Sequence, residues 1–157
     1  MSVIGKRVNR SEGAERVTGA GLFTDDYKVH GMLHAAIVRS PAARGIIQRI
    51  DTDRIIGKDS VRGIFTFRDI PGKNCIPIVI DDQPFLAEKA VNYISEPISI
   101  VIADDRQSAR AAVQDVEVKI KELTPLLDPL EARNQKDIHL FGNDNIYRHL
   151  KIRRGNP

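Results

Sequence analysis

One continuous unit between residues 97 and 123 restricts the possible folds of this chain more than any other feature. Residues 98–103 are all apolar except one serine, which predicts a strand buried within a sheet. Asp104, followed three residues later by Gln107, is typical of a helix start. The next residues repeat at helical spacing and give one apolar face made of small side chains: Ala109, Ala112, Val113 and Val116. Small side chains let a helix lie close to a sheet.

The periodicity then changes from helical to alternating. Val116, Val118 and Ile120 are expected to face inward, while the charged residues between them face solvent. A strand, a helix and a second strand in direct succession indicate the α/β or α+β class. We therefore expect a single domain with a mixed β-sheet and a few short helices.

Other segments extend this domain. Three apolar runs are strand candidates, at residues 32–38, 46–50 and 61–67. The first is almost continuously apolar, which predicts a strand buried on both faces. Asp51 is expected to cap a short helix that ends at Gly57. Residues 73–84 contain several prolines and are expected at a sheet edge or in an ordered loop.

The two ends of the chain lack such patterns. Residues 1–30 are polar and glycine-rich, which predicts an extended arm rather than a helix. Residues 31–125 form the expected domain, and residues 126–157 are expected to be loop-like. Within the domain, we expect Ile100 to be a core residue whose replacement by aspartate prevents folding.

Composition and charge exclude several classes of protein. With 41% hydrophobic and 29% charged residues, the chain has ordinary globular values. No apolar run approaches the roughly 20 residues of a membrane-spanning helix. The first residues do not resemble a secretory signal, so we expect a cytoplasmic protein. Most of the net charge of +3 comes from residues 148–154, for which binding to RNA or an acidic surface is a weaker alternative to a solvated tail.

The sequence contains no recognisable catalytic or metal-binding motif. Its one cysteine, Cys75, excludes an internal disulfide and a site with several thiolates, and we expect it to be buried. The pair Gly19 and Gly21 precedes the first strand and lacks the third glycine of a dinucleotide fingerprint. The histidines are scattered, with no pair one helical turn apart. We therefore predict no catalytic, cofactor-binding or metal-binding residue in this chain.

A series of short segments resembles, in order and spacing, the start of the molybdenum-binding subunit in the xanthine dehydrogenase and aldehyde oxidase family. The matches begin with Arg7 and Arg10 and together cover residues 1 to about 125. They include Arg16-Val17-Thr18-Gly19, Phe23-Thr24-Asp25-Asp26, Gly31-Met32-Leu33-His34-Ala35, Arg39-Ser40-Pro41, Asp69-Ile70-Pro71-Gly72-Lys73-Asn74 and Glu96-Pro97. Each segment is short, and the specificity lies in their combination.

The resemblance implies an α/β hammerhead domain. In such enzymes this module precedes the domains that hold a molybdenum pterin dinucleotide, with [2Fe–2S] clusters and FAD on partner subunits. Enzymes of this family hydroxylate a C–H position of an aldehyde or N-heterocycle with oxygen from water. Their catalytic glutamate and pterin contacts lie in the later domains, so no catalytic residue is carried over to this chain.

Two loops depart from the family pattern. After Pro41 the family often has histidines, whereas this chain has Ala42-Ala43-Arg44-Gly45. Before Glu96 the family usually has glycine, whereas this chain has Ser95. Because glycine tolerates positive φ best, Ser95 argues against a tight turn of that kind.

The resemblance favours one function and leaves a second open. The first is a structural domain or split subunit of a molybdenum hydroxylase that is inactive alone and binds the pterin-binding part of the large subunit. The alternative is a free-standing protein-binding module with the same fold. Arg39, Ser40 and Pro41 are the expected interface, since Pro41 favours an extended Ser40 and arginine makes paired hydrogen bonds. An equal alternative is that Arg39 bonds to carbonyls of its own domain.

Overall fold

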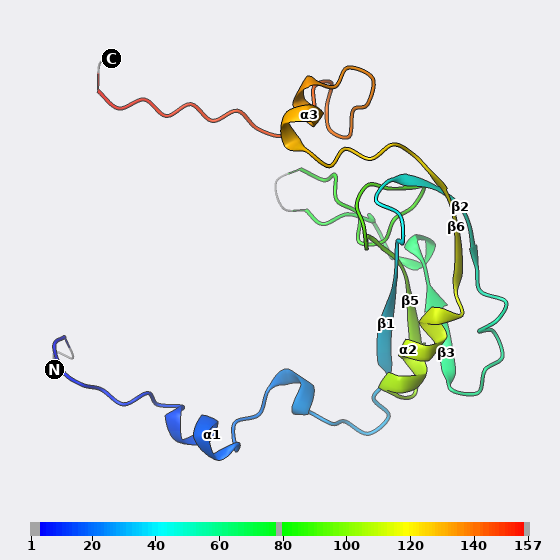
Figure 1. Cartoon of the computed structure of the whole chain (residues 1–157). Helices are drawn as coiled ribbons and strands as arrows, with labels where there is room; N and C mark the ends of the chain where they lie inside the picture. Colours follow the sequence, from blue (N-terminus) through cyan, green and yellow to red (C-terminus); the bar gives the residue numbers. More distant parts are fainter. Residues whose placement is uncertain (1–3, 78–79, 156–157) are drawn as a thin grey trace. The chain divides into compact units, whose positions relative to one another are not determined.

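The computed structural model describes residues 4–77 and 80–155, in two compact units (Figure 1). One unit ends at Met32 and the other begins at Leu33. Among the described residues, none lies in a helix that is both long and apolar enough to cross a membrane.

The first unit contains two short helical segments, α1 (Gly13–Thr18) and the 3-10 helix η1 (Thr24–Asp26). The expected arm therefore holds a helix that its glycines did not indicate. Glu12 and Arg16 form an ion pair of 3.1 Å across one helical turn, and Gly19, at φ 75°, ends α1 in the left-handed conformation.

The second unit contains the predicted buried strand as the centre of a sheet. The strand order is β1 (His34–Arg39), β5 (Pro97–Ala103), β3 (Val61–Phe65), and both pairings are antiparallel. The helix α2 (Arg106–Gln114) packs on all three strands (Figure 1). The helix-on-sheet packing expected from the small apolar residues is confirmed.

The remaining strands form a second antiparallel sheet, in the order β4 (Ala90–Val91), β2 (Gly45–Asp51), β6 (Glu117–Glu122). The expectation of one mixed sheet is therefore wrong, although the α/β class holds. Hydrophobic periodicity identifies strands but does not reveal which strands pair, and this is the reason for the error. At Gly45, an added Cβ would lie 2.4 Å from the side chain of Ile120, so glycine is needed for the close approach of β6.

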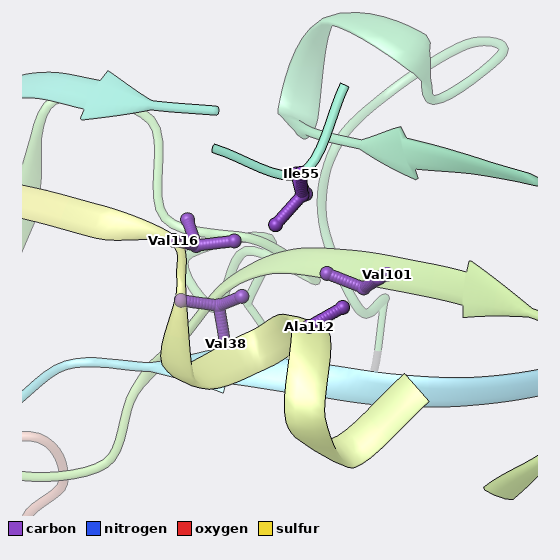
Figure 2. Close-up of a cluster of buried hydrophobic side chains, with 5 residues drawn as sticks. All are labelled: Val38, Ile55, Val101, Ala112 and Val116. Atoms are coloured by element: carbon purple, nitrogen blue, oxygen red, sulfur yellow. The ribbon is translucent and has the colours of Figure 1, made fainter. Parts of the chain in front are cut away.

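The main core lies between α2 and the sheets. Figure 2 shows five buried side chains from different segments directed toward one another: Val38, Ile55, Val101, Ala112 and Val116. A second cluster lies under the segment that enters β4 and consists of Ala87, Val91 and Ile98. Apolar burial of this extent is the main favourable contribution to folding.

The start of α2 differs by one residue from the prediction. Asp105, not Asp104, is the N-cap, and its Oδ1 accepts hydrogen bonds from the backbone N–H groups of Gln107 (2.9 Å) and Ser108 (2.8 Å). These are the second and third helical positions that an N-cap side chain serves. Asp104 instead pairs with Arg62, whose Nε lies 2.6 Å from its Oδ1.

Other local expectations need correction as well. Residues 53–57 form turns rather than a helix. The Asp51 carboxylate accepts a hydrogen bond of 3.1 Å from the N–H of Asp53, which favours a local turn. β3 ends at Phe65, and Phe67 begins a 3-10 helix, η2 (Phe67–Asp69). The final segment contains a short helix, α3 (Pro129–Asn134), which Asp128 caps. Part of the 73–84 segment is an irregular loop, and residues 78–79 lie outside the described residues.

Candidate functional site

The three residues expected at an interface lie where β1 ends. Arg39 is the last residue of β1 and is exposed, and its Nη1 donates a hydrogen bond of 3.0 Å to the carbonyl of Ser95. This bond lies within the same domain, which is the alternative noted above. It occupies one of the five N–H donors of the guanidinium, so docking through Arg39 stays a prediction.

Ser40 stabilises the corner that Arg39, Ser40 and Pro41 form at the end of β1. It is only 3% exposed, and its hydroxyl donates to the Ala42 carbonyl (2.7 Å) and accepts from the Ala42 N–H (3.1 Å). Its backbone N–H donates to the Glu96 carbonyl, and its carbonyl accepts from the N–H of Ser95, both at 2.9 Å. Ser40 is therefore a structural residue of the corner, while Pro41 beside it is exposed.

The facing turn, residues 93–96, keeps the geometry that the serine was expected to exclude. Ser95 has φ 66°, in the left-handed region that glycine adopts most easily. The neighbouring Glu96 is buried, and its Oε2 accepts from the N–H of Asn92 at 2.5 Å. The hydrogen bonds to Ser40 and from Arg39 hold the turn in place despite the strain at Ser95.

An apolar row beside the corner was not recognised from the sequence. Ile37, Ile100 and Phe65 are register partners across the sheet of β1, β5 and β3. Ile37 is 39% exposed and Phe65 is 47% exposed. Since α2 packs on the face that carries Val101, this row lies on the other side of the sheet. The prediction that the first strand is buried on both faces is therefore wrong, and so is the placement of Ile100 in the core.

A groove of about 350 Å³ follows this row. Phe85, Leu86, Ile70 and Pro71 complete its apolar wall, and Pro97 connects it to the corner. The apolar walls can bury the side chains of another protein surface, and Thr66 and Asp69 supply polar groups beside them. The sequence contained a signal for this surface. The unit between residues 97 and 123 includes a single helix, which can cover one face of a sheet, whereas the strand pattern predicts two apolar faces.

Two aspartates with lowered pKa values, Asp104 and Asp105, serve local structure. Arg62 lowers the pKa of Asp104 by a hydrogen bond and by its charge. Bonds from Ser108 lower the pKa of Asp105, the N-cap of α2. Cys75 is buried, as predicted. Within residues 4–77 and 80–155, no three side chains of His, Cys, Asp or Glu are grouped so that they could hold a metal ion.

Comparison with known proteins agrees with the resemblance seen in the sequence. The family model for the "Aldehyde oxidase and xanthine dehydrogenase, a/b hammerhead domain" matches residues 18–124. The nicotine 6-hydroxylase large subunit of Paenarthrobacter nicotinovorans is 37% identical over 140 residues, which cover 83% of this chain and 17% of that protein. The nicotinate dehydrogenase large molybdopterin subunit of Eubacterium barkeri is 27% identical over 95% of this chain and 36% of its own length.

Solved structures agree in fold. The aldehyde oxidoreductase of Desulfovibrio desulfuricans superposes with a TM-score of 0.84 at 25% identity, over 92% of this chain and 17% of that one. This chain thus spans well under half the length of each of these relatives. The matched residues include β1, the corner, the groove and α2. The chain belongs to the a/b hammerhead domain family of aldehyde oxidase and xanthine dehydrogenase.

Proposed function

We propose that this chain is the hammerhead part of a molybdenum hydroxylase, as a structural domain or a split subunit, and that it has no catalytic activity alone. Its binding partner is the pterin-binding part of the large subunit. The assembled enzyme then uses a molybdenum pterin dinucleotide, with iron–sulfur and flavin subunits as further partners. The names of the relatives, a large subunit and a large molybdopterin subunit, support this assignment.

The observation that carries the proposal is the uncovered apolar face of the β1-β5-β3 sheet. Ile37, Ile100 and Phe65 form a continuous row there, and α2 packs on the opposite face of the sheet. Contiguous apolar surface of this kind marks protein-binding sites. Burial of such a row contributes roughly 25 cal/mol for each Å² removed from water.

The pterin cofactor does not enter the chemistry of this chain. We assign no residue of this chain to molybdenum or to the pterin. When bound elsewhere in the enzyme, the cofactor supplies the redox chemistry of the hydroxylation. This chain contributes a surface that orients the large domains. The purified chain is therefore expected to oxidise neither aldehydes nor purines.

The test is capture of the tagged chain from its native host, followed by molybdenum analysis of the captured complex. We expect molybdenum in near-stoichiometric amount. Two matched variants locate the interface: Ile37→Asp removes an apolar residue of the row, whereas Ile56→Asp changes an isoleucine outside it that is 70% exposed. The first variant is expected to lose the molybdenum-containing partner and the second to retain it.

Two results would contradict the proposal. One is capture of a stable partner without molybdenum, which would favour the free-standing binding module. The other is equal molybdenum recovery with Ile37→Asp, which would show that the partner binds a different surface.

A further inference from the structure

A second groove lies between the two sheets. It shares only Thr66 with the groove beside Ile37, Ile100 and Phe65, which is the proposed docking face. It measures about 760 Å³ and is lined by β2 residues from Ile47 to Ile50, by Ile64 of β3 and by Thr66, which follows β3. Phe67, Arg68, Glu88 and Lys89 complete the wall. The groove thus borders strands of both sheets.

Both of these strands present an unpaired edge. β2 pairs with β6 along its length, but with β4 only at Gly45 and Ile46, and one further bond joins the Ile47 N–H to the Lys89 carbonyl. In the described chain, residues 48–51 have no strand on that side. Among the described strands, β3 pairs only with β5, so its other edge carries no strand either. Open edges carry backbone donors and acceptors that an added strand can satisfy.

The charges around the groove select the partner. Arg49, Arg68 and Lys89 line it against a single acid, Glu88. Arg49 is already paired with Asp51 at 2.8 Å, whereas Arg68 and Lys89 make no ion pair within the described residues. The Arg68 guanidinium lies 5.5 Å from the centre of the Phe67 ring, which leaves its edge N–H groups available to an anion.

The base of the groove is apolar. Ile47, Ile50 and Ile64 are partly buried and pack against the two core clusters. An extended segment alternates its side chains between two faces, so one set can contact these isoleucines while the other reaches the cations. A nucleic acid has no backbone amide groups for the strand edges, and the Phe67 ring is already covered by Arg68.

We propose that this groove binds an extended protein segment with alternating apolar and acidic side chains, which adds as a strand to the free edge of β2. The free part of β2, residues 48–51, has room for about four residues of the segment at roughly 3.3 Å per residue. The carboxylates of the segment pair with Arg68 and Lys89. The free edge of β2, Arg68 and Lys89 lie outside the lining of the docking face, and this site does not require molybdenum in the partner.

The probe is a fluorescein-labelled octapeptide of alternating valine and glutamate, titrated with the full-length chain and followed by fluorescence anisotropy. Three control probes, two peptides and one oligonucleotide, separate the contributions. One replaces glutamate with lysine, one carries N-methyl groups on alternate amides to block strand addition, and one is an oligouridine in place of a peptide. The glutamate peptide is expected to bind at least about tenfold more tightly than each control.

Variants of the chain test the residues. Arg68→Gln with Lys89→Gln is expected to weaken binding of the glutamate peptide about tenfold. Arg153→Gln with Arg154→Gln removes the same charge from an exposed segment outside the groove and is expected to change the affinity less than about twofold. All four residues are exposed, and circular dichroism checks that both double variants keep the fold.

The proposal is overturned if the groove and tail double variants bind the peptide equally well. It is also overturned if the N-methylated peptide or the oligouridine binds as tightly as the glutamate peptide. These outcomes are separate from the molybdenum capture experiment, because the peptide assay uses only the isolated chain. Either hypothesis can therefore fail while the other stands.

Discussion

The two faces of the β1-β5-β3 sheet are built from the same three strands but differ in burial. On one face, Ala36, Val101 and Ile64 are register partners, and Val101 is fully buried under α2. On the other face, the partners one residue along are Ile37, Ile100 and Phe65, which remain partly exposed. Side chains alternate between faces along a strand, so a shift of one residue exchanges core for surface.

This difference separates folding from binding within one sheet. The covered face stabilises the domain through the cluster of Val38, Val101 and Ala112 (Figure 2). The uncovered face is as apolar but adds little to the stability of the isolated domain, because water still reaches it. Substitutions on the two faces should therefore affect different properties, and the following experiments are arranged from the largest expected effect to the smallest.

The sharpest comparison places the same charge on adjacent residues of β5. Val101→Asp is expected to prevent folding, since an unpaired carboxylate at a fully buried position costs several kcal/mol against a total of about 5–15 kcal/mol. Ile100→Asp is expected to fold with a lowered melting temperature. Circular dichroism of both variants during heating is the measurement. A folded Val101→Asp, or an unfolded Ile100→Asp, would show that the covered and uncovered faces have been assigned the wrong way round.

Ser99 offers a change in the opposite direction on the covered side. It lies on the same side of β5 as Val101, it is fully buried, and its hydroxyl has no hydrogen-bond partner among the described residues. Ser99→Ala removes the unpaired hydroxyl and is expected to stabilise the chain by about 1 kcal/mol. Urea unfolding measures this difference, and Ser108→Ala is a contrasting control that should destabilise, because its hydroxyl bonds to the Asp105 carboxylate. A loss of stability in Ser99→Ala would mean that its hydroxyl is satisfied.

A smaller stabilisation is expected from relieving the strained turn at Ser95, which faces the end of β1. Ser95→Gly relieves the left-handed conformation at φ 66° but makes the unfolded chain more flexible. The net gain is expected to be about 0.5 kcal/mol in urea unfolding. The Arg39 bond to the carbonyl of residue 95 should be retained, since it uses only the backbone. Ser95→Ala should give no such gain, and equal stabilities of the two variants would contradict the strain.

The N-cap of α2 gives the smallest expected effect, a dependence of stability on pH. Hydrogen bonds from Ser108 lower the pKa of Asp105 in the folded state below its unfolded value of about 3.9. The stabilisation from the charged cap is therefore complete above that value and is lost as the pH falls through the folded pKa. Melting temperatures of the parent and Asp105→Asn should converge in acid, because asparagine also caps but does not titrate. Parallel curves between pH 7 and pH 2 would argue against this role.

The sequence predicted those elements whose pattern is local. The central strand, the small-residue face of α2 and the alternation in β6 each follow from the spacing of apolar residues within one element. The predicted N-cap of α2 was one residue too early. Asp104 and Asp105 have identical side chains, and only the structure shows that the Asp105 carboxylate accepts from the N–H groups of Gln107 and Ser108. The other carboxylate is used by Arg62, which is distant in the sequence.

Features that depend on distant residues were not predictable from local patterns. The division into two sheets depends on β6 pairing with β2, a choice that periodicity does not encode. Ile37 and Ile100 are partly exposed because α2 covers the other face of the β1-β5-β3 sheet. Arg39 lies at the end of the first strand, as its sequence pattern predicted, but the internal bonds of Arg39 and Ser40 involve residues 95 and 96, more than fifty positions away.

The central claim is that the face carrying Ile37 is covered only in the assembled enzyme. The most direct measurement uses Ile37→Cys in a Cys75→Ala background and follows the rate of maleimide modification, with Val38→Cys as the buried control. We predict rapid modification of Cys at position 37 in the isolated chain and strong protection in the molybdenum-containing complex, with slow modification at position 38 in both. Equally rapid modification at position 37 in the chain and in the complex would contradict the claim.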